Sequence, residues 1–194
     1  MDGTTGKTSG GMVKEWYEKH GAVWPLSIPV SHSWVDLGKV MMAVQYTQCK
    51  TFIEFGVHRG GLSSLLIART LLDDLTYFGF EINENIIEPK VKTLCNISPF
   101  ASIYIGDLFH INTYTFIRRL IKKCSSPVLI YCDNGNKALE FRMYRGCLRE
   151  GDFIMMHDFN REFTIHDIAS KWWTIMDTEF THQGSVLLLK KTKE

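Results

Sequence analysis

Carboxylates follow two apolar runs of the sequence, at positions where they could do chemistry. Asp133 comes directly after "VLIYC", and Asp158 comes after "FIMMH". If the two runs are neighbouring parallel strands about 4.8 Å apart, their carboxylates can converge on one divalent cation. His157 and Asn160 flank Asp158 and extend the candidate ligand set, although an imidazole suits Mn, Fe, Ni or Zn better than Mg. His157 is equally open to interpretation as a general base or as a hydrogen-bonded structural residue.

A glycine-containing turn lies between an apolar run and a helix-like segment, in "IEFGVHRGG" followed by "LSSLLIARTLL". Gly56, Gly60 and Gly61 allow the backbone to approach a ligand closely, and the start of the next helix offers free N–H groups. The spacing G-x-x-x-G-G differs from the dinucleotide fingerprint G-x-G-x-x-G. The turn therefore disfavours an NAD-dependent oxidoreductase and fits a ligand that carries a carboxylate.

Two further acids are placed to bind a nucleoside. Glu81 ends "YFGFE", where a carboxylate can accept hydrogen bonds from a ribose diol, and Asp107 follows "IYIG", where it can accept from an exocyclic amine such as that of adenine. Glu54 lies in the run that enters the glycine turn. Each acid alone could be an ordinary solvated residue, but the ordered series indicates a nucleoside site.

The elements that position these residues alternate in type. Apolar runs at 51–56, 77–81, 101–105, 127–132 and 152–157 predict strands buried on both faces, and the segments 61–72, 84–95, 113–123 and 137–148 between them predict helices. Asn83 is the expected cap of the second helix, and Asn112 or Thr113 that of the third. Short connections between such elements predict a parallel sheet with helices on both faces.

The end of the chain predicts a different arrangement. After a helix around 165–175, "DTEFTH" (177–182) and "SVLLLKK" (185–191) are separated by two residues, too few for a helical crossover, so an antiparallel hairpin is expected. The predicted fold is α/β: a Rossmann-like, mostly parallel seven-stranded sheet with helices on both faces and an antiparallel C-terminal hairpin.

The residues before this core are expected to form an N-terminal helical cap. We predict one domain, with a disordered head at 1–11, the cap at 12–50, and the core at 51–194. Tyr17, Trp24 and Trp34 could line an acceptor pocket beneath the cap, and core packing explains the tryptophans equally well.

The sequence resembles the S-adenosylmethionine-dependent class I methyltransferases over residues 33–190. "FIEFGVHRGG" looks like their glycine-loop motif and "FEIN" like their ribose-binding acid. "WVDLGKVMMAVQY" ahead of "IEFG" is similar to the catechol O-methyltransferase-like branch. "YCDNGNK" and "GDFIMMHDF" are closer to the macrocin O-methyltransferase and cephalosporin hydroxylase-like group, which includes rhamnosyl O-methyltransferases.

This resemblance implies a cofactor, a metal and catalytic residues. The expected contacts of S-adenosylmethionine are Glu54, Gly56, His58, Gly60, Gly61, Glu81, Asp107, Leu108 and Asp133. The expected ligands of Mg or Mn are Asp133, Asp158, His157 and Asn160. Asp133, Lys137 and His157 are the catalytic candidates, Lys137 as a base whose pKa burial depresses.

Two positions depart from the family pattern. The catechol-type enzymes have Asn after the second aspartate, where this chain has Phe159, and the sugar-type enzymes favour an acid before it, where this chain has His157. The catechol-type lysine also falls one position earlier, at Asn136 here. These differences leave the metal, and the role of Lys137, open.

Composition narrows the remaining function classes. The net charge of +1 and the absence of a basic stripe disfavour nucleic acid as a partner, and no apolar run is long enough for a membrane span. Five widely spaced cysteines read as reduced thiols in a cytoplasmic protein. The prediction is metal-assisted O-methylation of a small hydroxylated acceptor, sugar or phenol-like, with a homo-oligomer left open. The alternatives are a metal-independent methyltransferase and a non-catalytic S-adenosylmethionine binder.

Overall fold

A computed structural model describes residues 28–168, 171–176 and 185–193 of the chain. Seven strands form one sheet in the order β3-β2-β1-β4-β5-β7-β6. The strands are β1 (Thr51–Phe55), β2 (Thr76–Glu81), β3 (Ala101–Ile105), β4 (Val128–Cys132), β5 (Phe153–Met156), β6 (Trp173–Ile175) and β7 (Leu187–Lys191). The first five are parallel, and β7 pairs antiparallel with both β5 and β6. The predicted mixed sheet is confirmed, and the first five strands lie within a residue of their predicted bounds.

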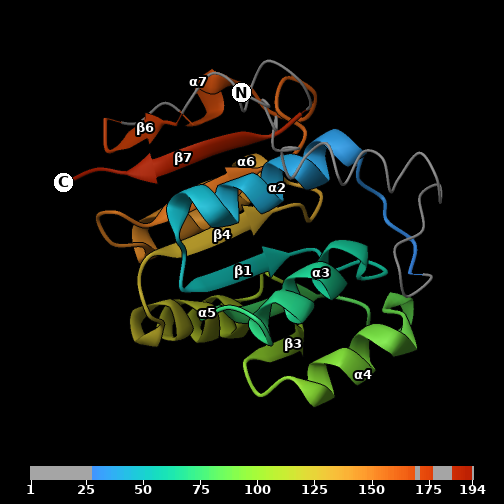
Figure 1. Ribbon diagram of the computed structural model, residues 1–194. Helices are drawn as coiled ribbons and strands as arrows, with labels where there is room; N and C mark the ends of the chain where they lie inside the picture. Colours follow the sequence, from blue (N-terminus) through green and yellow to red (C-terminus); the bar gives the residue numbers. More distant parts are fainter. Residues whose placement is uncertain (1–27, 169–170, 177–184, 194) are drawn as a thin grey trace, which may run out of the picture.

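Helices cover both faces of the sheet (Figure 1). They are α2 (Trp34–Thr47), α3 (Gly61–Thr70), α4 (Pro89–Ile97), α5 (Ile111–Lys123), α6 (Lys137–Tyr144) and α7 (Ile165–Ile168), with 3-10 turns η1 (Glu84–Ile86) and η2 (Arg145–Cys147). Successive side chains of each strand point to opposite faces of the sheet, so each face has its own hydrophobic core. Phe52 and Tyr131 pack with α2, α3 and α4, whereas Phe55 and Ile130 pack with α5, α6 and α7.

Helix α2 belongs to the layer on one face of the sheet. Leu37, Val40 and Val44 from α2 are buried in the same core as Phe52 of β1. Ser33 caps the helix by accepting a hydrogen bond from the Asp36 backbone N–H at 3.1 Å. Residues 28–33, which precede α2, lie beside the carboxyl end of β4, where His32 contacts Asp133.

Two predicted helix starts were wrong. The helix expected at 84–95 begins only at Pro89, because proline lacks the N–H that a helix interior needs, and Asn83 caps the turn η1 instead. Helix α5 begins at Ile111, and its cap is His110, whose Nδ1 accepts from the Asn112 N–H at 3.3 Å.

The predicted helix at 165–175 was also wrong. It ends at Ile168, and residues 173–175 form β6, which pairs with β7. Aromatic and β-branched side chains favour a strand here, and Trp173 packs against Phe141 with ring centroids 5.5 Å apart. The strand expected at 177–182 lies outside the described residues. Within the described part of the chain, no helix is long and apolar enough to cross a membrane.

Candidate functional site

The glycine turn after β1 has a backbone that other residues would strain. Gly56 and Gly60 have φ of +90° and +87°. A Cβ on Gly56 would lie 2.6 Å from the Asp133 carbonyl oxygen, and one on Gly60 would lie 2.6 Å from the Val91 side chain. Glycine thus lets the turn approach both the end of β4 and helix α4, and α3 begins directly after it.

Glu81, at the end of β2, is tied to the same turn. Its Oε2 accepts a hydrogen bond from the His58 backbone N–H at 2.8 Å. Its Oε1 accepts from the N–H groups of Ile82 at 2.7 Å and Asn83 at 3.1 Å. A carboxylate oxygen has two lone pairs, so the group can still accept from a bound ligand.

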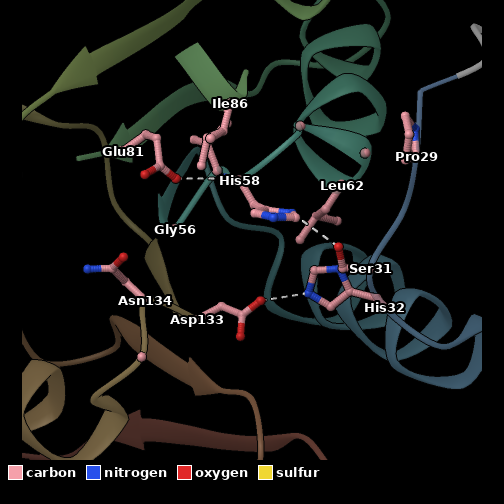
Figure 2. A pocket seen from close by; sticks show the side chains of 14 residues that line it. Pro29, Ser31, His32, Gly56, His58, Leu62, Glu81, Ile86, Asp133 and Asn134 are labelled. Carbon is pink, nitrogen blue, oxygen red and sulfur yellow. Dashed lines mark hydrogen bonds and ion pairs between the residues drawn. The ribbon is translucent and has the colours of Figure 1, made fainter. Parts of the chain in front are cut away.

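A cavity of about 420 Å³ opens between the glycine turn and the ends of β2 and β4. Figure 2 shows Glu81, His58 and Asp133 around it, with His32 entering from the segment before α2. The lining residues are Pro29, Ser31, His32, Gly56, Val57, His58, Gly60, Gly61, Leu62, Glu81, Ile86, Asp133, Asn134 and Gly135. The cavity lies where strand order reverses between β1 and β4, which is the usual ligand position in open α/β sheets.

Asp133 joins two histidines from distant segments. Its Oδ2 lies 2.9 Å from His32 Nε2, and its Oδ1 lies 3.1 Å from His157 Nδ1. Each of the three side chains offers one donor atom, and these atoms all lie within 4.8 Å of one another. The sequence pattern predicted Asp133 and His157 but not His32, because His32 follows no strand.

The charges around His157 favour its protonated form. Burial alone would lower the pKa of His157, but hydrogen bonds to Asp133 and Asp36 raise it to about 10. Burial alone would raise the pKa of Asp133, but hydrogen bonds from His157 and His32 hold it well below its usual range. Without a bound cation, His157 therefore carries a proton at neutral pH and is a poor general base.

Asp36, a second residue that the sequence pattern did not predict, contacts the His157 ring nitrogen that faces away from Asp133. Its Oδ2 lies 3.5 Å from His157 Nε2. Asp36 also accepts hydrogen bonds from the Ser33 hydroxyl at 2.5 Å and from the Ser185 N–H at 3.1 Å. Burial would raise the pKa of Asp36, but hydrogen bonds from His157 and Ser33 lower it to about 2. Asp36 lies inside α2, where an acid ordinarily signals only a favourable helix start.

Lys137 does not have the properties expected of a base. Its Nζ lies 2.9 Å from Glu162, 3.1 Å from Asp158 and 3.6 Å from Asp133. Burial alone would lower the pKa of Lys137, but its contacts with Glu162 and Asp158 raise it above the usual lysine value. The expected depressed pKa was wrong, because three carboxylates stabilise the ammonium.

Three of the predicted cofactor contacts lie outside the residues that line the cavity. Glu54 is buried beneath the start of α3, where its Oε2 accepts from the hydroxyls of Ser63 at 2.8 Å and Tyr77 at 2.5 Å. Asp107 is exposed and accepts from the Phe109 N–H at 2.9 Å. Leu108 is buried in the core. The remaining predicted contacts, Gly56, His58, Gly60, Gly61, Glu81 and Asp133, all line the cavity.

The two predicted ligands that follow β5, Asp158 and Asn160, lie in different surroundings. Asp158 Oδ2 lies 3.1 Å from both His157 Nδ1 and Lys137 Nζ. Asn160 is exposed. Tyr17 and Trp24 lie outside the described residues, and Trp34 is described only as the first residue of α2.

Comparisons with known proteins place the fold. No family model and no curated protein sequence matches the chain. A solved cmcI structure that contains Mg and SAM is 13% identical with a TM-score of 0.67, over 88% of this chain and 76% of that chain. The SAM-bound O-methyltransferase TomG from Streptomyces achromogenes is 12% identical with a TM-score of 0.59, over 95% and 90%. The SAH-bound Podospora anserina methyltransferase PaMTH1 is 10% identical with a TM-score of 0.63, over 95% and 88%. The chain shares the fold of these methyltransferases.

Proposed function

We propose that this chain is an S-adenosylmethionine-dependent O-methyltransferase that acts on a small hydroxylated acceptor, with assistance from a divalent metal. The observation that carries the proposal is the arrangement of Glu81 and the glycine turn around one cavity at the strand-order reversal. The shared fold of solved methyltransferases, some with SAM or SAH bound, supports it.

The parts of the cofactor have matching chemistry in the cavity. The Glu81 carboxylate can accept hydrogen bonds from the ribose diol, since it already lies at the cavity wall on β2. The start of α3 offers N–H groups and a positive helix end to the amino-acid carboxylate. Arg59 does not fill this role, because its guanidinium pairs with Glu88.

Methyl transfer needs alignment more than covalent help. The bond between sulfur and the methyl carbon breaks as the bond to the acceptor oxygen forms, so the sulfonium becomes a thioether, and the acceptor hydroxyl releases its proton to water. Most of the acceleration comes from holding oxygen, carbon and sulfur in line. A metal bound beside Asp133 would supply Lewis acidity that lowers the pKa of the acceptor hydroxyl. Lys137, held protonated by carboxylates, would stabilise negative charge there and not remove the proton.

The test is transfer of labelled methyl from S-adenosylmethionine to a panel of catechols, phenols and sugars. We expect labelled ether products, and we expect Asp133→Asn to lower the rate at least about 100-fold because the side chain lies at the reacting centre. Asp74→Asn is the matched control: Asp74 pairs with Lys50 at the amino ends of β1 and β2, away from the cavity, so the rate should be unchanged.

Chelation separates the alternatives. Activity that chelator abolishes and added metal restores supports metal assistance, whereas activity that resists chelator would assign a metal-independent methyltransferase. Cofactor binding without product from any acceptor, unchanged in Asp133→Asn, would assign a non-catalytic S-adenosylmethionine binder.

A further inference from the structure

The donor set beside the cavity does not suit Mg²⁺, one of the two ions expected from the resemblance. Mg²⁺ prefers octahedral oxygen ligands, whereas His32 and His157 present imidazole nitrogens on either side of Asp133. Two nitrogens and one carboxylate are the ligands that first-row transition metals favour. Within the described residues, Asp133 is the one carboxylate that shares this donor group with the two histidines.

We propose that His32, Asp133 and His157 form a site for a divalent transition metal such as Zn²⁺, Co²⁺, Mn²⁺ or Fe²⁺, in preference to Mg²⁺. The inference deepens the metal assistance proposed above and shares its location. It also assigns a metal-binding role to the segment before α2, which contains His32.

The distances are close to those of a metal site. Ligand atoms about 2.1 Å from one ion on adjacent octahedral positions lie about 3 Å apart. Asp133 Oδ2 is 2.9 Å from His32 Nε2, and Asp133 Oδ1 is 3.1 Å from His157 Nδ1. One Asp133 oxygen and one nitrogen of each imidazole lie within 4.8 Å of one another, so a shared ion could replace these hydrogen bonds.

Residues behind His157 complete the arrangement. Metal-bound histidines usually direct their second ring nitrogen to a carboxylate, a carbonyl or water, which fixes the ring orientation. His157 Nε2 faces Asp36 Oδ2 at 3.5 Å and Ser185 Oγ at 3.2 Å, on the side opposite the cluster. Asp36 is held in turn by Ser33 and by the Ser185 N–H. The ring is therefore oriented before any metal binds.

Neighbouring side chains favour a cation and limit the ligand set. Asp158 is near His157 but pairs with Lys137, and Lys137 also pairs with Glu162. The carboxylates of Asp158 and Glu162 add negative charge beside the three proposed ligands, and the Lys137 ammonium neutralises part of that charge. Asn160, predicted from the sequence as a ligand, is exposed and belongs to no part of this group.

Cobalt titration of the metal-stripped, full-length protein tests the proposal without cofactor or acceptor. Co²⁺ gives visible absorption bands whose position reports nitrogen and oxygen coordination. We expect one equivalent to bind, Zn²⁺ to displace it, and a large excess of Mg²⁺ to leave the bands in place. His32→Ala should weaken Co²⁺ binding at least about 100-fold, because loss of a residue that only hydrogen-bonds a metal ligand already lowers metal affinity about 10 to 100-fold.

Two controls separate the ligand sets. His166→Ala removes an exposed imidazole from α7 and should leave Co²⁺ binding unchanged. Asp158→Asn removes a neighbouring carboxylate that is not one of the three proposed ligands. This variant should keep the Co²⁺ absorption bands. Loss of binding in Asp158→Asn together with retention in His32→Ala would overturn the proposal in favour of a carboxylate site.

Wild-type protein gives a second measurement that does not depend on the folding of a variant. In the proton NMR spectrum of the Co²⁺-loaded protein, two histidine ligands should give two strongly shifted, solvent-exchangeable imidazole N–H signals. Absence of such signals, displacement of Co²⁺ by Mg²⁺, or no Co²⁺ binding would contradict the site. Because none of these readouts uses methyl transfer, the site can fail while the proposed activity stands, and the reverse.

Discussion

At the scale of single residues, strand ends indicated some of the residues that line the cavity, but the same reasoning also selected Asp107, which lies outside the cavity lining. Glu81 and Asp133 were found because each comes directly after an apolar run. His32 reaches Asp133 across 101 positions of sequence, from a segment whose local pattern predicts only a helix start. Contacts of this kind depend on where α2 packs, which no short motif encodes.

Gly56 gives the first prediction at this scale. Gly56→Ala should lower the free energy of unfolding by about 1–2 kcal/mol or more, because φ is +90° and the new Cβ would lie 2.6 Å from the Asp133 carbonyl oxygen. Denaturant unfolding measures the change. Gly146→Ala is the control, since a Cβ there meets nothing within 4 Å. Equal stability of the two variants would show that the turn tolerates side chains.

Glu54 gives a prediction about pH. Burial raises the pKa of Glu54 from 4.5 to about 8, while hydrogen bonds from Tyr77 and Ser63 oppose the shift. The folded state therefore holds a proton that the unfolded state releases. Its stabilising contribution is complete below about pH 4.5 and is lost as pH rises through about 8.

Glu54→Gln should remove this pH dependence, because the amide keeps an acceptor for both hydroxyls and carries no charge. Unfolding free energies measured between these pH limits should fall with rising pH in the wild type relative to Glu54→Gln. Parallel curves for the two proteins would mean that Glu54 has an ordinary pKa.

At the scale of elements, strands were predicted more accurately than helices. The runs that form β1 and β4 are buried along their whole length, so their ends coincide with the ends of the apolar pattern. Helix α5 begins at His110, a residue type that is not among the usual helix caps, and β6 begins inside a helix-like pattern because it pairs with β7. Trp173 forms part of a strand because it pairs with Lys191 of β7.

Asp152 gives the prediction for this scale, because it joins the starts of β4 and β5. It is fully buried and accepts hydrogen bonds from Ser126 Oγ at 2.6 Å, the Val128 N–H at 2.8 Å and the Arg149 N–H at 2.8 Å. Asp152→Ala leaves these donors unpaired and should destabilise the protein by about 3 kcal/mol or more. Thermal and urea unfolding measure the loss, with exposed Asp74→Ala as the control. A loss below that of the control would contradict the assigned role.

At the scale of the whole molecule, strand order explains why distant residues share one cavity. Because β1 lies between β2 and β4, the glycine turn, Glu81 and Asp133 lie together at the carboxyl ends of three adjacent strands. This strand order was not predicted, but a mostly parallel sheet was predictable from the alternation of elements. The contribution of residues 28–33 was not, because the segment reaches the cavity through the packing of α2 on the sheet.

The central claim is that this cavity binds S-adenosylmethionine through Glu81. Calorimetric titration of S-adenosylmethionine into wild type, Glu81→Ala and the control Asp74→Ala tests it most directly. Hydrogen bonds to a charged group contribute about 1.5–3 kcal/mol, so Glu81→Ala should weaken binding at least about tenfold while Asp74→Ala matches wild type. No binding to wild type, or equal affinity in Glu81→Ala, would contradict the account.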